Sequence, residues 1–333
     1  MTIGLVSISF VLSVAGVWIF RKLAEGSPRF LDIPNNRSSH STPITRGAGI
    51  AIVLVVLGLY VAVFRAEANL AYIVASLIIA VVSFLDDLFS VPLLIRLGVH
   101  FGVASLFVYS SGFYSEISVP WSDGAAFCFG EIAPFVSILF IVWTINAFNF
   151  MDGIDGIAGA QAMGASIGWV LLGVAAGSSG LSFLGAILFG ASAGFLVFNW
   201  QPAKVFMGDV GSTFLGFTFA IFPLIDSADG PRIEPWAFSA TIIFLWLFLF
   251  DTIFTRFRQI ASLQPFWRPH RDHLYQRVVL RGRPHQPVAA YFGVVAIAIA
   301  LAFSFAGTIS LFPLAILLIL SPISLMLWAG KKD

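Results

Sequence analysis

The stretch from Asn146 to Gly159 reads Asn-Ala-Phe-Asn-Phe-Met-Asp-Gly-Ile-Asp-Gly-Ile-Ala-Gly and joins two long apolar runs, residues 132–148 and 157–176. Runs of this length are typical of helices that cross a membrane. The polar side chains between them are therefore predicted to lie where a membrane helix meets water. A carboxylate at that depth is costly unless water, a cation or a hydrogen-bond donor accompanies it. The stretch thus marks both a helix boundary and a candidate site.

Three side chains in this stretch recur at a helical spacing. Asn149, Asp152 and Asp155 are three residues apart, so they would share one face of a helix. Two acids and an amide on one face form a plausible cradle for a divalent cation that also holds phosphate oxygens. The glycines between them would let a bulky ligand approach the backbone. The alternative interpretation is a polar helix boundary in which Asp152 is an N-cap.

The composition places the whole chain in a membrane. Of its 333 residues, 59% are hydrophobic and 11% are charged, whereas soluble domains average about 25% charged residues. The mean hydropathy is +0.94. We predict an all-α polytopic integral membrane protein, because a β-barrel would show alternating polarity instead. The single cysteine, Cys128, excludes an internal disulfide framework. No cleavable signal peptide is expected, since no basic residue precedes the first apolar run.

Apolar runs recur from one end of the chain to the other. We treat residues 1–333 as a single transmembrane domain, because no internal repeat or low-complexity linker interrupts them. The predicted spans are residues 2–20, 47–64, 70–85, 97–112, 132–148, 157–176, 181–199, 210–225, 236–254, 289–306 and 309–328.

Charge is distributed unequally over the two sides of this topology. The loops after the odd-numbered spans, together with the C-terminal tail, hold all of the 18 lysines and arginines except Arg65 and Arg232. The positive-inside rule then places the N-terminus outside and the C-terminus in the cytoplasm. The same parity brings the candidate polar residues to the cytoplasmic face, namely Asp86, Asp87, Asn149, Asp152, Asp155, Asp209, His270 and His273.

Two cytoplasmic loops carry candidate phosphate and proton-transfer groups. In the first loop, Arg37 can fork onto a phosphate and His40 can donate to one, although a basic loop resting on anionic headgroups has the same composition. The second loop begins at Asp86 and Asp87, adjacent carboxylates that could accept a proton or bind a cation. Simple helix termination is the alternative for this pair. Arg96 follows as a candidate phosphate contact.

The loop 199–209 ends at the start of the predicted eighth span. Asp209 opens that helix, where an acid also suits the helix dipole. Lys204 could hold a phosphate as a point charge. Phe206 could stack on a flat base.

The largest and most basic loop, residues 255–288, contains His270, Arg271 and His273. Histidine and arginine side chains suit a polyanionic pyrophosphate. A zinc site is less favoured, because no third protein ligand is evident. Binding to the membrane surface is the alternative.

Taken in order, these motifs resemble those of the polyprenyl-phosphate N-acetylhexosamine-1-phosphate transferase family. The resemblance runs from Asp32 to Arg283: an Asp-x-Pro…Arg…His…Pro…Gly loop, the Asp-Asp pair, residues 146–159, Phe-Met-Gly-Asp-x-Gly-Ser at 206–212, and His-Arg-Asp-His at 270–273. Each motif alone is moderately specific for this family. The ordered set of motifs on one membrane face is strong evidence for the resemblance. The predicted topology of eleven spans with an external N-terminus is also similar to that of the family's bacterial antigen-initiating branch.

The resemblance implies a reaction at the cytoplasmic face. A UDP-N-acetylhexosamine would meet undecaprenyl phosphate, the lipid phosphate would attack the phosphorus next to the sugar, and UMP would leave. Asp209 and Asn149 are implied ligands of Mg²⁺, with Mn²⁺ as an alternative ion. The implied catalytic residues are Asp86, Asp87, Asp152 and Asp155. The implied substrate contacts are Arg37, His40, Arg96, Asn146, Asn199, Lys204, Phe206, His270, Arg271 and His273.

Departures from the peptidoglycan branch narrow the expected substrate. That branch carries a lysine in the first loop and consecutive histidines in the fifth. Here no lysine lies between Lys22 and Lys204, and the histidines are spaced His-x-x-His. A UDP-muramoyl-pentapeptide is therefore less favoured than UDP-GlcNAc or a deoxygenated N-acetyl sugar for surface polysaccharide or O-antigen. No nucleic-acid partner is expected, and the oligomeric state is left open, with a homodimer as one option.

Two other function classes compete with this interpretation. An intramembrane Mg-dependent prenyltransferase also uses acids and a prenyl diphosphate, but its acids usually recur four apart after an Asn-Asp pair. A polytopic transporter would carry ionisable groups near the bilayer midplane. Here the predicted spans are nearly free of such groups, and the polar residues gather at one face.

Overall fold

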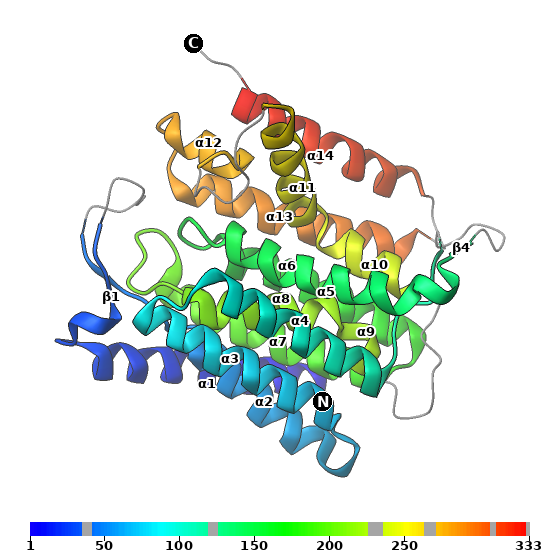
Figure 1. The fold of residues 1–333 in the computed structure, drawn as a ribbon, viewed down its shortest axis with the longest axis horizontal. Coiled ribbons are helices and arrows are strands. Elements are labelled where there is room, and N and C mark those ends of the chain that lie inside the picture. The colour runs from blue at the N-terminus through cyan, green and yellow to red at the C-terminus, as the bar shows by residue number, and fades with distance from the viewer. Residues whose placement is uncertain (35–41, 119–125, 226–235, 263–270, 307–310, 331–333) are drawn as a thin grey trace.

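The computed structural model describes residues 1–34, 42–118, 126–225, 236–262, 271–306 and 311–330. Helices dominate this part of the chain (Figure 1). Their bounds are α1 Thr2–Ala24, α2 Ile50–Phe64, α3 Leu70–Phe89, α4 Leu93–Ser111, α5 Ala133–Met151, α6 Ile157–Ala176, α7 Ser179–Asn199, α8 Gly208–Ala220, α9 Phe222–Ile225, α10 Ala237–Phe244, α11 Trp246–Ala261, α12 Leu274–Leu280, α13 His285–Phe305 and α14 Phe312–Gly330. The prediction of an all-α polytopic membrane protein is confirmed.

Most of the long helices are apolar enough to cross a membrane. Among the residues that the structure describes, nine helices pass this test, or ten when the bent pair α10 and α11 counts as one span. The axes of that pair differ by 74°. The predicted span 210–225 corresponds to the 13-residue α8 followed by the short α9. The count of eleven spans therefore stays a prediction.

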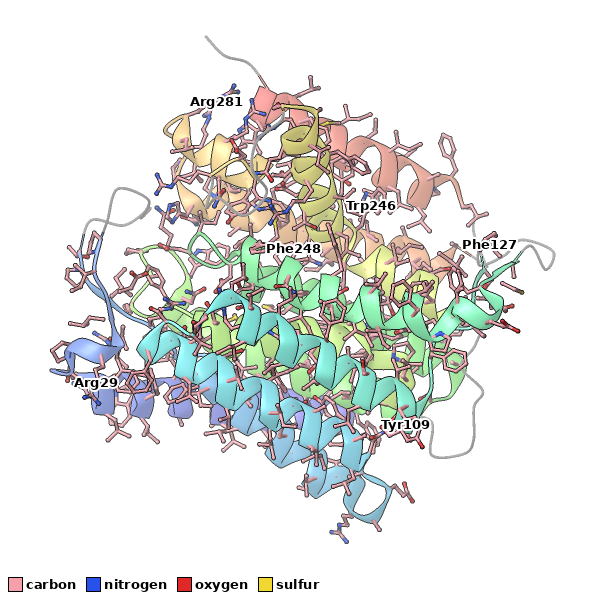
Figure 2. All side chains as sticks on the ribbon, in the orientation of Figure 1. Arg29, Tyr109, Phe127, Trp246, Phe248 and Arg281 are labelled. Carbon is pink, nitrogen blue, oxygen red and sulfur yellow. The ribbon has the colours of Figure 1, made fainter. Side chains whose placement is uncertain are left out.

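The long helices run roughly side by side, so the bundle has two distinct ends (Figure 1). One end carries α12 and a short hairpin of β1 Leu31–Asp32 and β2 Ile44–Thr45; the other carries the hairpin of β3 Glu116–Ser118 and β4 Ala126–Cys128. Arg29 and Arg281 lie at the first end, and Phe127 lies at the second (Figure 2). We refer to the first as the basic end.

Helix α8 lies at the centre of the bundle, in contact with α2, α3 and α5. Its apolar side chains, such as Phe214, Phe217 and Phe219, are fully buried, as expected for a helix that is hydrophobic on all sides. On another side, α7 contacts α1 and α6, and α13 contacts α6. Glycines allow close approach there, since a Cβ at Gly164 or Gly194 would collide with the neighbouring helix.

The polar stretch at 146–159 differs from its prediction. Helix α5 ends at Met151 and α6 begins at Ile157, so residues 152–156 form a loop. Asp152 is the C-cap of α5, and Gly156 is the N-cap of α6 in the left-handed conformation. The predicted shared helical face of Asp152 and Asp155 is therefore wrong, and so is the alternative of Asp152 as an N-cap. The physical reason is Gly156, whose left-handed backbone (φ +81°) does not fit the interior of a helix.

Candidate active site

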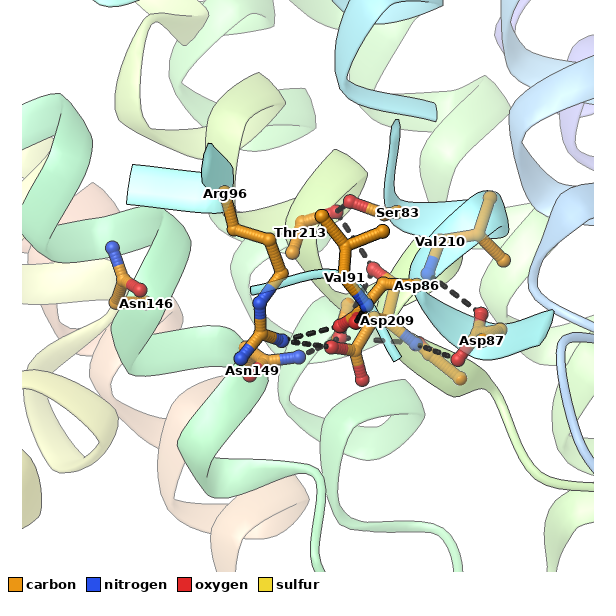
Figure 3. Close-up of polar contacts among 12 residues, drawn as sticks. Ser83, Asp86, Asp87, Val91, Arg96, Asn146, Asn149, Asp209, Val210 and Thr213 are labelled. Atoms are coloured by element: carbon orange, nitrogen blue, oxygen red, sulfur yellow. Dashed lines mark hydrogen bonds and ion pairs between the residues drawn. The ribbon is translucent and has the colours of Figure 1, made fainter. Parts of the chain in front are cut away.

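Three carboxylates from two helices converge at the basic end of the bundle (Figure 3). Asp86 and Asp87 lie in the last turn of α3, and Asp209 lies in the first turn of α8. Asp87 accepts hydrogen bonds from the backbone N–H groups of Asp209 (2.9 Å) and Val210 (3.1 Å). The end of α3 thus caps the start of α8 through a side chain. We refer to Asp86, Asp87 and Asp209 as the acid cluster.

The guanidinium group of Arg46 bridges two members of the acid cluster. Its Nε lies 2.8 Å from Asp87 Oδ1, and its Nη2 lies 2.7 Å from Asp209 Oδ1. Burial alone disfavours the charge of Arg46, but the carboxylates of Asp209 and Asp87 outweigh this effect and raise its pKa above the ordinary value. Arg46 therefore stays charged and holds α3 and α8 in register.

Backbone pairing carries Arg46 to the cluster from a distant part of the chain. Thr45 forms a parallel bridge with Val205, and the N–H of Phe206 donates to the Thr45 carbonyl (2.7 Å). The N–H groups of Ala48 and Gly49 donate to residues 206 and 207 in turn. A Cβ at Gly49 would lie 2.5 Å from the Gly211 Cα, so only glycine permits this approach.

Gly208 fits the gap between the two helices of the cluster. Its backbone is left-handed, with φ of +74°, and a Cβ there would lie 2.5 Å from Asp87 Oδ2. Glycine is the residue that tolerates both the conformation and the contact. The sequence Phe-Met-Gly-Asp thereby delivers the Asp209 and Val210 N–H groups directly to Asp87.

Arg96 is the second cation of the site. Its Nη1 contacts Asp86 Oδ2 and lies 2.8 Å from Asp209 Oδ2 (Figure 3). The other oxygen of Asp86 accepts from the Val91 N–H (2.7 Å), which ties the α3–α4 turn to the same carboxylate. The Arg96 Nε is buried and has no hydrogen-bond partner among the described residues. An orphaned buried donor is uncommon in proteins, so the hydrogen-bonding capacity of Arg96 is only partly used here.

Side-chain hydroxyls and an amide support the first turn of α8. The hydroxyl of Thr213 donates to the Asp209 carbonyl (2.6 Å) and lies 2.8 Å from the Ser83 hydroxyl on α3. Asn149, near the end of α5, donates to the Ser212 hydroxyl (3.2 Å) and lies beside Asp209 (Figure 3). The predicted pair of Asn149 and Asp209 therefore does come together.

Asp152 stands in the loop directly after α5. Burial, together with the negative charge of Asp209, raises the pKa of Asp152 well above its usual range, while Arg46 opposes the shift. The influence of Asp209, Arg46 and Asp87 on this group places it within electrostatic reach of the acid cluster. Asp152 therefore binds a proton more readily than an ordinary aspartate does.

Asp155 has a different environment from Asp152. One of its oxygens lies 3.2 Å from His285 Nδ1 at the start of α13, and the other accepts from the Ala203 N–H (3.1 Å). It is buried. Its contacts join three chain segments, and this placement supports a positioning role better than the predicted catalytic one.

Asn199 and Asn146 also make contacts with the protein itself. The Asn199 side chain accepts from the Gly156 N–H (2.9 Å) and donates to the Val205 carbonyl (2.9 Å), so it fastens the loop 152–156 to the loop before α8. Asn146 donates to the Val142 carbonyl and faces His100 at 3.4 Å, away from the acid cluster (Figure 3). The structure thus does not bring Asn146 to the three acids.

Helix α12 is fastened between α11 and the end of α5. The fully buried Asp251 accepts from the N–H groups of Leu274 (2.9 Å) and Tyr275 (3.2 Å), and its Oδ1 lies 3.3 Å from His273 Nδ1. The Tyr275 hydroxyl donates to the Phe150 carbonyl (2.9 Å). His273 is thereby oriented by a carboxylate and held next to the segment that carries Asn149 and Asp152.

The remaining predicted residues are at least partly exposed or lie outside the described part of the chain. Lys204 is exposed, and the side chains of Phe206 and Arg271 are partly exposed. Phe206 anchors the loop through its backbone hydrogen bonds. Arg37, His40 and His270 lie outside the described residues.

Sequence reasoning missed Arg46 and Asp251. The only sequence signal near Arg46 is the pair of glycines at 47 and 49, which can indicate a close approach to another backbone. Sequence spacing likewise gives no sign that Asp251 accepts from two backbone donors.

Comparisons with known proteins show which family this chain belongs to. Residues 69–226 match the model of glycosyl transferase family 4. A probable undecaprenyl-phosphate N-acetylglucosaminyl 1-phosphate transferase of Bacillus subtilis (strain 168) is 32% identical over 261 residues, which cover 77% of this chain and 71% of the relative. The chain belongs to the polyprenyl-phosphate N-acetylhexosamine-1-phosphate transferase family.

Two further relatives have a lower sequence identity to this transferase. An undecaprenyl-phosphate alpha-N-acetylglucosaminyl 1-phosphate transferase of Yersinia pestis is 29% identical over 296 residues, covering 82% of this chain and 75% of the relative. A phospho-N-acetylmuramoyl-pentapeptide-transferase of Lactococcus lactis subsp. cremoris (strain MG1363) is 29% identical over 245 residues, covering 67% and 72%. The matched family region contains α3 and α8, which carry the acid cluster, and α5, which carries Asn149.

The donor atoms of this transferase suit a magnesium ion. A carboxylate oxygen of Asp209 and the amide oxygen of Asn149 are the hard ligands that Mg²⁺ prefers. Among the described residues, no group of three or more Asp, Glu, His or Cys side chains is arranged to hold a metal ion by itself. Mg²⁺ is usually bound through one or two carboxylates together with substrate phosphates, so this donor set fits an ion that is held jointly by protein and substrate.

Proposed function

We propose that this transferase moves N-acetylhexosamine 1-phosphate from a UDP-sugar to undecaprenyl phosphate. The observation that supports it most is the acid cluster with its two bridging arginines, built from α3, α4, α8 and the loop before α2 at the basic end of an apolar bundle. A membrane lipid with a phosphate head group and a soluble nucleotide sugar can both reach such a place. The positive-inside rule supports the cytoplasmic face as the side of this site.

The reaction exchanges one phosphoanhydride bond for another. An oxygen of the lipid phosphate attacks the β-phosphorus of the UDP-sugar, the bond from that phosphorus to the bridging oxygen breaks, and UMP leaves with the electron pair. The product is undecaprenyl pyrophosphate linked to the sugar. Because both reactants are anionic, the main task of the site is to lower their repulsion and hold them in line.

The residues of the cluster fit these tasks. Asp209 and Asn149 would hold Mg²⁺, which supplies positive charge to the pyrophosphate when it is bound. Asp86 or Asp87 would position the lipid phosphate or accept its proton. Asp152 would contact the nucleotide. His273, which Asp251 orients, would face the phosphates together with Arg271. Phe206 would stack on uracil.

The sugar is proposed to be N-acetylglucosamine or a related N-acetylhexosamine for surface polysaccharide, such as O-antigen. The relatives include both N-acetylglucosaminyl 1-phosphate transferases and phospho-N-acetylmuramoyl-pentapeptide-transferases. The absence of lysine between Lys22 and Lys204 favours the first group for this chain.

A labelling experiment tests both the reaction and the bond that breaks. Purified protein in detergent is given undecaprenyl phosphate, Mg²⁺ and UDP-GlcNAc that carries ³²P only at the β-phosphorus. The proposal predicts that the label enters the lipid fraction and that unlabelled UMP forms in equal amount. Label that remains in a water-soluble nucleotide or appears as free phosphate would contradict it. Other UDP-sugars in the same assay define the specificity.

A further inference from the structure

Asp209, the carboxylate proposed to bind metal, is already shared between two cations of the protein. Arg46 Nη2 lies 2.7 Å from Asp209 Oδ1, and Arg96 Nη1 lies 2.8 Å from Asp209 Oδ2. Each arginine also contacts a second carboxylate, Asp87 or Asp86. Both oxygens of the central acid thus face a guanidinium group.

A magnesium ion and these guanidinium groups need the same oxygens. Mg²⁺ binds oxygen at about 2.0–2.1 Å in a nearly ideal octahedron, and a positive group at hydrogen-bond distance from the same oxygen repels it. The side chain of Asp209 is 14% exposed, so few other directions of approach remain. We propose that Arg46 and Arg96 compete with the divalent cation for Asp209, so that metal binding requires a guanidinium to move off this carboxylate. This inference rests on the proposed metal site.

The side chains of the two arginines have room and reason to move. The backbone of Arg46 is fixed, since its N–H donates to the Phe30 carbonyl (2.7 Å) and its neighbours pair with residues 205–207. Its side chain, however, is 36% exposed, and that of Arg96 is 29% exposed. The buried Nε of Arg96 also lacks a partner in the described structure. When either guanidinium swings toward solvent, the backbone pairing of residues 45–49 and the hydrogen bonds from α8 to Asp87 still join these segments.

Competition of this kind couples the metal to the nucleotide. A pyrophosphate is a strong acceptor for guanidinium groups, so a bound UDP-sugar attracts Arg46 and Arg96 and releases Asp209 for the ion. Linkage is reciprocal, and the ion strengthens nucleotide binding by the same factor. Arg46 and Arg96 thus act as positioning residues that keep the free protein from binding metal tightly before its substrate arrives.

The test measures binding of Mn²⁺, used as the paramagnetic probe, by EPR titration of the purified full-length protein in detergent. No lipid phosphate is present, so no turnover occurs. We expect Arg46→Gln and Arg96→Gln to tighten Mn²⁺ binding by roughly tenfold, in the range of typical coupling energies. Arg46→Lys keeps the charge but cannot bridge two carboxylates, so it should tighten binding by a smaller factor. With UDP-GlcNAc present, the wild-type protein should approach the affinity of the variants.

Three comparisons make the outcome decisive. Arg29→Gln removes an exposed positive charge that lies over Phe89 at the same end, and it should leave Mn²⁺ affinity unchanged. Tighter binding in Arg46→Gln with wild-type affinity in Arg46→Lys would mean that net charge alone acts, which overturns the displacement. Wild-type affinity in both glutamine variants, with binding abolished in Asp209→Asn, would overturn the inference and leave the metal site standing. No Mn²⁺ binding in wild type with UDP-GlcNAc would overturn both.

Discussion

Asp87 accepts a hydrogen bond from the backbone N–H of Asp209, so one acid of the cluster fixes the position of another across two helices. The contact joins residues 122 positions apart in the chain. Because Asp87 also accepts from Val210, its carboxylate serves as the N-terminal cap of α8 and as a site residue at once. These two roles can be separated by substitution.

Asp87→Ala should lower the stability of the protein more than Asp87→Asn. Alanine leaves two N–H groups of α8 without an acceptor, and loss of a helix cap costs about 1–2 kcal/mol, whereas asparagine retains one acceptor oxygen. Both variants lose the bridge to Arg46 and should lose transferase activity. Thermal melting in detergent and the transfer assay measure the two effects. If the Asp87→Ala protein had the same melting temperature as the wild type, the capping role would be excluded.

Gly208→Ala should reduce activity far more than a matched glycine substitution elsewhere. Gly208 and Gly177 have similar left-handed backbones, with φ of +74° and +69°. A Cβ at Gly208 meets the Asp87 carboxylate, whereas a Cβ at Gly177 meets no atom within 4 Å. Both variants bear the backbone cost of about 1–2 kcal/mol, so the difference between them reports the collision with Asp87. Equal activities in the transfer assay would contradict the assignment of Gly208.

Asp152→Asn should gain stability relative to wild type as the pH rises. Burial and the charge of Asp209 raise the pKa of Asp152 in the folded protein, while its unfolded pKa is about 3.9. Between these two values the folded state binds more protons than the unfolded state, so wild-type stability falls with increasing pH. Asparagine removes this dependence. The difference in melting temperature, variant minus wild type, should grow as the pH rises above about 3.9. A constant difference would show that Asp152 does not titrate there.

Asp251→Ala should loosen α12 and with it His273. The substitution leaves the Leu274 and Tyr275 N–H groups unpaired, at about 1–3 kcal/mol each. Hydrogen exchange of residues 271–280 should become faster, and the Michaelis constant for the UDP-sugar should rise. Asp272→Asn is the matched control, because the Asp272 carboxylate lies 3.5 Å from Arg258 and is 37% exposed, and such pairs contribute little. Unchanged exchange in Asp251→Ala would refute the role of Asp251.

Much of the fold followed from hydropathy and charge, because lipid imposes long apolar helices. The parity of the spans predicted that four polar residues lie at the same end of the bundle, namely Asp86, Asp87, Asn149 and Asp209. The bend between α10 and α11 was not, since each half is apolar and no proline marks the break.

The details of the site depended on contacts that sequence spacing does not contain. The interval of three between Asp152 and Asp155 suggested one helical face, but the glycines break the helix there, and Asp155 binds His285 instead. Arg46 reaches Asp209 only because residues 45–49 pair with residues 205–207. Such long-range pairings depend on tertiary packing, which local patterns do not encode.

The most direct test of the central claim, that the acid cluster catalyses sugar-phosphate transfer to a lipid, is the rate of undecaprenyl-pyrophosphate-sugar formation by Asp209→Asn. Glu131→Gln, a substitution of an exposed carboxylate in the 3-10 turn Gly130–Ile132 at the opposite end of the bundle, is the matched control. We predict that Asp209→Asn loses roughly 10²–10³-fold in rate, as expected when a key electrostatic group is removed, while Glu131→Gln keeps the wild-type rate. A folded Asp209→Asn protein that forms the lipid product as fast as wild type would contradict the account.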